Sequence, residues 1–116
     1  MIEDEANIAE AVRFILTRAG WRFSLYPEGT GALQQIHAQR PRLVILDLML
    51  PGRSGSEILS DLRADTDSTL AGLPVLMLSA RAQHPALIPK LDQATAVLAK
   101  PFANDDLRRI VRELLA

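Results

Sequence analysis

Three polar side chains of this 116-residue chain stand immediately after short apolar runs. Asp47, Ser79 and Lys100 each follow four consecutive apolar residues, and a fourth polar group, Glu3-Asp4-Glu5, lies near the amino terminus. If the runs are parallel strands, their carboxyl ends share one edge of the sheet, which is where open α/β sheets bind ligands. We therefore expect these side chains to converge.

The residue types at these positions suit one kind of chemistry. Clustered carboxylates repel one another, so the cluster needs a cation or a shared proton. Oxygen ligands alone favour a hard ion such as magnesium. A carboxylate can attack phosphorus, and a metal, an ammonium and a hydroxyl stabilise the transferring group. Asp47, Asp4, Lys100 and Ser79 supply this set, which predicts a magnesium-dependent phosphoacceptor site.

The elements that must position these residues follow from hydrophobic periodicity. Residues 6–19 and the stretch around Leu107 show the spacing of amphipathic helices, with Asn104 as the expected cap of the last one. The apolar runs lack alternation, which is typical of strands buried on both faces of a parallel sheet. Residues 65–74 are interpreted as an exposed connection. Alternating helices and strands predict a doubly wound α/β fold.

Only Met1 and Ile2 precede the acidic cluster, so either the first strand is truncated in this chain or the given start is not the natural one. That strand should lie inside the sheet, where its shortening would leave main-chain groups of its neighbours without partners. Each such buried group costs about 1–3 kcal/mol.

Composition limits the function classes. Thirteen basic and 14 acidic residues leave a net charge of -1, so no general field favours nucleic acid or an anionic membrane. The absence of cysteine excludes disulfides and thiol catalysis. No apolar run approaches the roughly 18 residues of a membrane span. We expect one cytoplasmic domain over residues 1–116, without a membrane or direct nucleic-acid partner.

Four segments resemble the signature segments of response-regulator receiver domains. They occur in the family's order, and the resemblance extends over essentially the whole chain. The segments are Ile2–Glu5, Leu46–Gly52, Leu78–Arg81 and Lys100–Phe102. The resemblance implies a flavodoxin-like fold with a five-stranded parallel sheet and helices on both faces. It implies a signalling domain of a two-component phosphorelay, not an enzyme beyond its own phosphoryl transfer and dephosphorylation.

The resemblance also implies residue roles. Asp47 would be phosphorylated by a histidine kinase or a histidine phosphotransfer protein. Magnesium would be bound directly by Asp4 and Asp47, through water by Glu3, and by the main-chain carbonyl of Met49. The metal site and the acceptor would therefore share one carboxylate.

Further positions match the phosphoryl-binding part of the family pattern. Ser79 and Lys100 would bind the phosphoryl oxygens, and the Lys100–Pro101 peptide bond would be cis. Met49 and Arg81 match the variable positions that tune the lifetime of the phosphoryl group.

Two departures from the family affect the expected output. Pro85 and Pro89 predict a short or irregular fourth helix. Val97 stands where the family carries an aromatic ring that follows phosphorylation. We expect residues 84–116 to form the surface for a homodimer or output domain, with weaker coupling to Asp47 than in receivers that keep the ring.

Competing functions stay open. A degenerate receiver would keep the fold as an interaction module without phosphorylation. A haloacid-dehalogenase-like hydrolase would need a second acid two residues after the nucleophile, where this chain has Met49. A flavin-binding module would need a phosphate-binding loop rich in serine, threonine or glycine, and no strand is followed by one.

Overall fold

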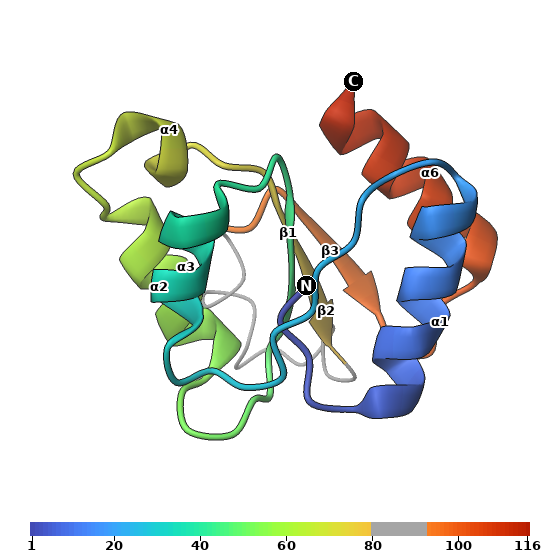
Figure 1. The fold of residues 1–116 in the computed structure, drawn as a ribbon, viewed down its shortest axis with the longest axis horizontal. Helices are drawn as coiled ribbons and strands as arrows, with labels where there is room; N and C mark the ends of the chain where they lie inside the picture. Colours follow the sequence, from blue (N-terminus) through green and yellow to red (C-terminus); the bar gives the residue numbers. More distant parts are fainter. Residues whose placement is uncertain (80–92) are drawn as a thin grey trace.

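The structure is a computed structural model that describes residues 1–79 and 93–116. The described elements are, in chain order, α1 (Ala6–Arg18), α2 (Ala32–Gln39), β1 (Val44–Asp47), α3 (Gly55–Arg63), α4 (Ser68–Ala71), β2 (Val75–Ser79), β3 (Ala96–Ala99) and α6 (Asn104–Leu115). Helices α1 and α6 lie on one side of the sheet, and α2 and α3 lie on the other (Figure 1). This is the predicted doubly wound α/β architecture.

The sheet is parallel and its order matches a flavodoxin-like fold. A three-stranded sheet has the order β1-β2-β3. Ile2 forms isolated parallel bridges to Tyr26 on one side and to Leu46 of β1 on the other. Five segments therefore lie side by side as predicted, although the first two are reduced to single bridge residues in the described part of the chain. The first strand is thus represented by Ile2 alone, in agreement with the few residues that precede the acidic cluster.

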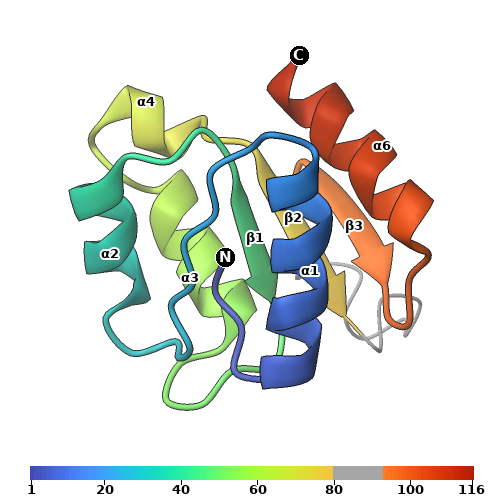
Figure 2. The same ribbon diagram turned by 45° about the vertical axis from the view of Figure 1, so that its right-hand side comes forward.

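Two apolar layers enclose the sheet. Strands β1 and β2 are buried along their whole length, because helices cover both of their faces. On one face α1 and α6 pack against Ile45, Leu76 and Leu78. On the other face α2 and α3 pack against Leu46 and Met77. Figure 2 shows α1 and α6 side by side in front of the sheet. This packing holds the strand ends in fixed positions.

Strand β3 differs from the prediction of burial on both faces. Its residues alternate between half-buried and exposed, and the Val97 side chain is 38% exposed. Among the described residues β3 has a strand neighbour on one side only, namely β2. An edge position explains the exposure that an apolar run alone did not reveal.

Two local predictions were wrong. Residues 65–74 are not an exposed connection, because they contain α4 and bury Leu70 and Leu73 in the core. Asp67 caps α4 by accepting a hydrogen bond from the Thr69 N–H at 2.9 Å. Asn104 is the first residue of α6 and not its cap, a position that Ala103 occupies without a side-chain bond.

Some sequence predictions lie outside the described residues, namely those on Arg81, Pro85, Pro89 and the fourth helix. Within residues 1–79 and 93–116, no helix combines the length and apolar character needed to cross a membrane.

Candidate functional site

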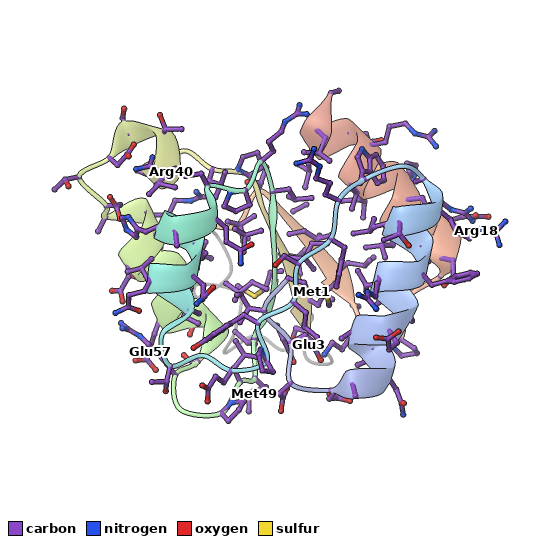
Figure 3. The ribbon with its side chains drawn as sticks, viewed as in Figure 1. Met1, Glu3, Arg18, Arg40, Met49 and Glu57 are labelled. Atoms are coloured by element: carbon purple, nitrogen blue, oxygen red, sulfur yellow. The ribbon has the colours of Figure 1, made fainter. Side chains whose placement is uncertain are left out.

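The parallel register brings the predicted polar residues to one edge of the sheet. Asp47 pairs with Leu78, the residue that precedes Ser79 in β2. Ser79 in turn pairs with Ala99 of β3, the residue that precedes Lys100. Glu3 reaches the same edge because Ile2 is bridged to Leu46. Figure 3 shows Glu3 and Met49 toward the end of the sheet at which the strand arrows of Figure 1 point. The predicted convergence is therefore present.

Lys100 is the centre of the ionic contacts. Its Nζ lies 3.1 Å from Oδ2 of Asp47 and 3.3 Å from Oε1 of Glu3. A third oxygen, Oε1 of Glu5, lies 3.8 Å away. Glu3 and Asp47 are buried, whereas Glu5 is exposed. One partly buried cation thus faces two buried carboxylates, which leaves an excess of negative charge.

Burial and the charge of the ionic partner have opposing effects on the pKa values of Glu3 and Lys100. Burial raises the pKa of Glu3 to about 7, with further contributions from a hydrogen bond and repulsion involving Asp47, and Lys100 opposes the rise. Burial acts to lower the pKa of Lys100, but Asp47 and Glu3 outweigh it and leave the pKa above its ordinary value. The lysine therefore stays charged, and Glu3 holds a proton more firmly than an exposed glutamate.

The acidic residues have the donor set of a hard cation. Ligand oxygens of Glu3, Asp4 and Asp47 all lie within 4.8 Å of one another. Oε2 of Glu3 is buried and has no hydrogen-bond partner among the described residues. Asp4 is exposed at the mouth of the cluster, where water can complete a coordination sphere. Magnesium keeps several waters and takes few protein carboxylates, so these residues fit that ion.

The loop after β1 is fixed by close main-chain packing. The Gly55 N–H donates to the Leu48 carbonyl at 2.9 Å, and a Cβ on Gly55 would lie 2.1 Å from the Asp47 carbonyl oxygen. Ser54 caps α3 by accepting from the Glu57 N–H at 3.3 Å. Only glycine lets α3 approach the strand end this closely, so this contact sets the position of Asp47.

Met49 extends from the same loop. Its N–H donates to Oδ1 of Asp47 at 3.3 Å, and its side chain is 64% exposed. The hydrogen bond orients the carboxylate, while the thioether side chain stands at the surface of the site. This exposure suits a position that a partner or a water molecule can reach.

The other expected residues also lie at this edge. Ser79 is buried, and its carbonyl accepts from the Lys100 N–H at 3.0 Å. The Lys100–Pro101 peptide bond is cis, as the resemblance implied. The direct contact of Lys100 with Glu3 was not predicted, since the sequence showed an acidic cluster without showing which acid faces the lysine.

Comparison with known proteins identifies the same family over nearly all of the chain. The model of the family described as "Response regulator receiver domain" matches residues 1–112. The DNA-binding response regulator MtrA of Mycobacterium tuberculosis is 34% identical over 116 residues, which is 99% of this chain and 49% of that protein. The probable transcriptional regulatory protein TcrX of the same organism is 34% identical over 119 residues. The chain spans about half the length of these relatives.

Solved structures agree with the fold. A putative response regulator from Chloroflexus aurantiacus has a TM-score of 0.87 at 33% identity, covering 98% of this chain and 93% of that one. The BeF3-activated N-terminal receiver domain of Klebsiella pneumoniae RstA has a TM-score of 0.86 at 26% identity, covering 98% and 94%.

Proposed function

Because the chain belongs to the response-regulator receiver family, we propose that it accepts a phosphoryl group on Asp47 in a two-component phosphorelay. The proposed donor is a phosphohistidine of a histidine kinase or of a histidine phosphotransfer protein. The observation that supports this function best is the 3.1 Å contact between Nζ of Lys100 and Oδ2 of the buried Asp47, beside acids suited to magnesium. A carboxylate that merely capped a turn would not need this partly buried cation.

The proposed step exchanges one bond to phosphorus for another. A carboxylate oxygen of Asp47 forms the new O–P bond, the P–N bond of the donor breaks, and its electron pair passes to the imidazole nitrogen. Lys100 and Ser79 would bind the phosphoryl oxygens, where charge is concentrated in the transition state. Lys100 is already held by Asp47 and Glu3, so little reorganisation is needed.

Magnesium is the proposed cofactor, and it would supply positive charge that offsets the carboxylates and the phosphoryl oxygens. Asp4 and Asp47 would bind it directly, and Glu3 would act mainly through water. The main-chain carbonyl of Met49 would complete the protein ligands. Oε2 of Glu3, which lacks a hydrogen-bond partner in the described structure, is available to a metal-bound water.

The chain would act as a signalling domain whose chemistry is its own phosphoryl transfer and dephosphorylation. Its output would be carried by residues 84–116, as a homodimer contact or against an output domain. The described part of that surface consists of β3 and α6. The alternative is a degenerate receiver, favoured by the bridge-length first strand, in which the same surface works without phosphate.

Acetyl phosphate labelling separates these two functions. With magnesium, the wild-type chain is expected to gain the mass of one phosphoryl group, and chelation of the metal should abolish the gain. Asp47→Asn should show none, while Asp105→Asn, which changes an exposed acid of α6 in the same way, should label like wild type. Thermal melting should show that both variants are folded. An unlabelled wild-type chain would favour the degenerate receiver.

A further inference from the structure

Two loops at the carboxyl end of the sheet are packed against each other. One loop, residues 27–31, precedes α2, and the other, residues 48–53, follows Asp47 at the end of β1. Figures 1 and 2 show them side by side beyond the ends of the strands. The N–H of Gly29 donates to the Pro51 carbonyl at 3.0 Å, so a main-chain hydrogen bond joins the two loops directly.

The contact between the loops leaves no room for a side-chain atom at two glycines. A Cβ on Gly29 would lie 1.9 Å from the Arg53 carbonyl oxygen, and a Cβ on Gly52 would lie 2.0 Å from Oγ1 of Thr30. Gly29 is buried, although its neighbours Glu28 and Thr30 are exposed. Only glycine allows the two main chains to approach this closely. A displacement of one loop would therefore displace the other.

Residues 51–53 form a tight turn that the neighbouring loop stabilises. The Arg53 N–H donates to the Pro51 carbonyl at 3.0 Å across Gly52, whose φ is +81°. A three-residue turn with a positive central φ is rare and strained, and strained turns persist where the surrounding structure holds them. Here the same Pro51 carbonyl also accepts the hydrogen bond from Gly29, which holds the turn from outside.

The loop of residues 27–31 is itself held at both ends. Tyr26, which precedes it, packs against the core, and its hydroxyl donates to the Thr30 carbonyl at 2.9 Å. At the other end, the N–H of the buried Ala32 donates to the Gly29 carbonyl at 3.1 Å. A loop that packed residues fix at both ends provides a rigid support for its neighbour.

The segment between the two fixed points of the second loop carries a proposed metal ligand. Leu48 is held in the sheet, since its N–H donates to the Leu78 carbonyl at 3.0 Å, and Pro51 is held by the neighbouring loop. Met49, whose main-chain carbonyl is a proposed magnesium ligand, lies between these points. Its N–H donates to Oδ1 of Asp47 at 3.3 Å. A shift of Pro51 would therefore move Met49 relative to Asp47.

We propose that residues 27–31 are a positioning element of the acceptor site, which holds residues 48–53 in the conformation that binds magnesium. This inference rests on the proposed function and assigns part of the metal affinity to a loop that contains none of the proposed ligands. A site binds best when its ligands are held in place by supporting contacts. Groups that orient metal ligands typically contribute about 10–100-fold to metal affinity.

Magnesium titration by calorimetry on the 116-residue chain tests this contact through Gly52→Ala. The added Cβ meets Thr30, and Kd should rise by about 10–100-fold. Gly20→Ala is the matched control, because its φ of +92° imposes a similar strain while no atom lies within 4 Å of the added Cβ. It should lose stability and keep the wild-type Kd. In metal-free Gly52→Ala, the Met49 amide should exchange faster, while the Leu48 amide stays unchanged.

A second substitution separates this contact from general damage to the fold. Thr30→Gly removes Oγ1 and Cβ, the side-chain atoms closest to the added Cβ, and leaves the main-chain nitrogen at 3.5 Å. The variant that combines Thr30→Gly with Gly52→Ala should therefore recover most of the lost magnesium affinity. A merely structural defect would become worse, because a glycine at position 30 also increases the conformational entropy of the unfolded chain.

A wild-type Kd in folded Gly52→Ala would overturn the proposal, and so would a double variant that binds magnesium no more tightly. If Gly52→Ala does not fold, Gly29→Ala replaces it, with Gly72→Ala as control. Neither glycine has a positive φ, and a Cβ on Gly72 would lie in ordinary contact at 3.4 Å. Only Gly29→Ala should weaken binding, and equal Kd values would overturn the proposal.

Failure of the proposed function gives a different result. If the wild-type chain binds magnesium and the variants behave as expected, but acetyl phosphate leaves no label, the proposed phosphoryl transfer is wrong and the positioning role stands. A wild-type chain that binds no magnesium would overturn both.

Discussion

Glu3 is the residue in which the conflict between burial and charge is most evident. It lies beside Asp47, it is almost fully buried, and its only cationic partner, Lys100, is shared with that neighbour within the described structure. Burial raises its pKa to about 7, which places its titration in the physiological range. The state of the site without metal should therefore depend on pH.

The sign of that dependence follows from proton linkage. Between the ordinary value of 4.5 and about 7, the folded chain binds the Glu3 proton more tightly than the unfolded chain does. The stability from this group is complete below pH 4.5 and is lost as pH rises through about 7. In metal-free buffer, Glu3→Gln should thus gain stability relative to wild type across this window, by on the order of 3 kcal/mol. Urea unfolding at several pH values measures the difference.

The difference in unfolding free energy between wild type and the Glu3→Gln variant isolates the contribution of Glu3. The Met1 ammonium titrates between about 6 and 8 with the opposite slope, but it does so in both. Glu10→Gln, which changes an exposed acid of α1, should run parallel to wild type. If the unfolding free energy of Glu3→Gln varied with pH in the same way as that of wild type, the assigned pKa shift would be contradicted.

At the scale of elements, the junction between β1 and α3 positions the acceptor. The helix begins so close to the strand end that a Cβ at Gly55 would overlap the Asp47 carbonyl. Ser54 caps the helix, and the Leu48 N–H pairs with the Leu78 carbonyl at 3.0 Å, so the strand end is bound to both neighbours. The position of the acceptor Asp47 thus depends on closely packed main-chain contacts.

Gly55→Ala should therefore displace the strand end from α3. We expect a loss of at least about 2 kcal/mol of unfolding free energy, in the range of overpacked cores, together with slower labelling by acetyl phosphate. Gly72→Ala is the matched control, because its Cβ would lie 3.4 Å from the Ser68 carbonyl oxygen, in ordinary contact. Similar melting temperatures for the two variants would show that the junction tolerates movement.

The elements also show which parts of the fold could be predicted. Helix α1 and strands β1 and β2 were predicted because their apolar spacing is a local property. Helix α4 was missed because Leu70 and Leu73 are buried by distant parts of the chain, while the local sequence of Asp, Ser and Thr is typical of a loop. For β3 the run of apolar residues was correct, but its place at the edge is a property of the whole sheet.

At the scale of the molecule, the two ends of the sheet differ in chemistry. The carboxyl ends of the strands carry the acids and Lys100, whereas Arg22, Arg40 and Arg42 lie around the opposite end of the sheet. The residue types of the site were predictable because they follow apolar runs. The pairing of Glu3 with Lys100 was not, since it depends on how far the first strand extends before the chain turns.

Phosphorylation of Asp47 is expected to have only a weak effect on the surface formed by residues 84–116. Val97 lies on β3 with its side chain 38% exposed, and a β-branched side chain is too stiff and small to act as a moving ring. Phosphate shifts a population only by its differential affinity for the two states. With beryllofluoride and magnesium, amide exchange should slow at residues 47–52 and change little across 104–115. Strong protection of residues 104–115 would show that another element carries the switch.

The central claim is that Asp47 receives the phosphoryl group. Treating the labelled chain with borohydride reduces an aspartyl phosphate to homoserine, and peptide mass spectrometry then locates the converted residue. We expect conversion at Asp47 alone, with Asp4 and Asp61 unchanged. Conversion at another acid, or a labelled chain without any converted aspartate, would contradict the account.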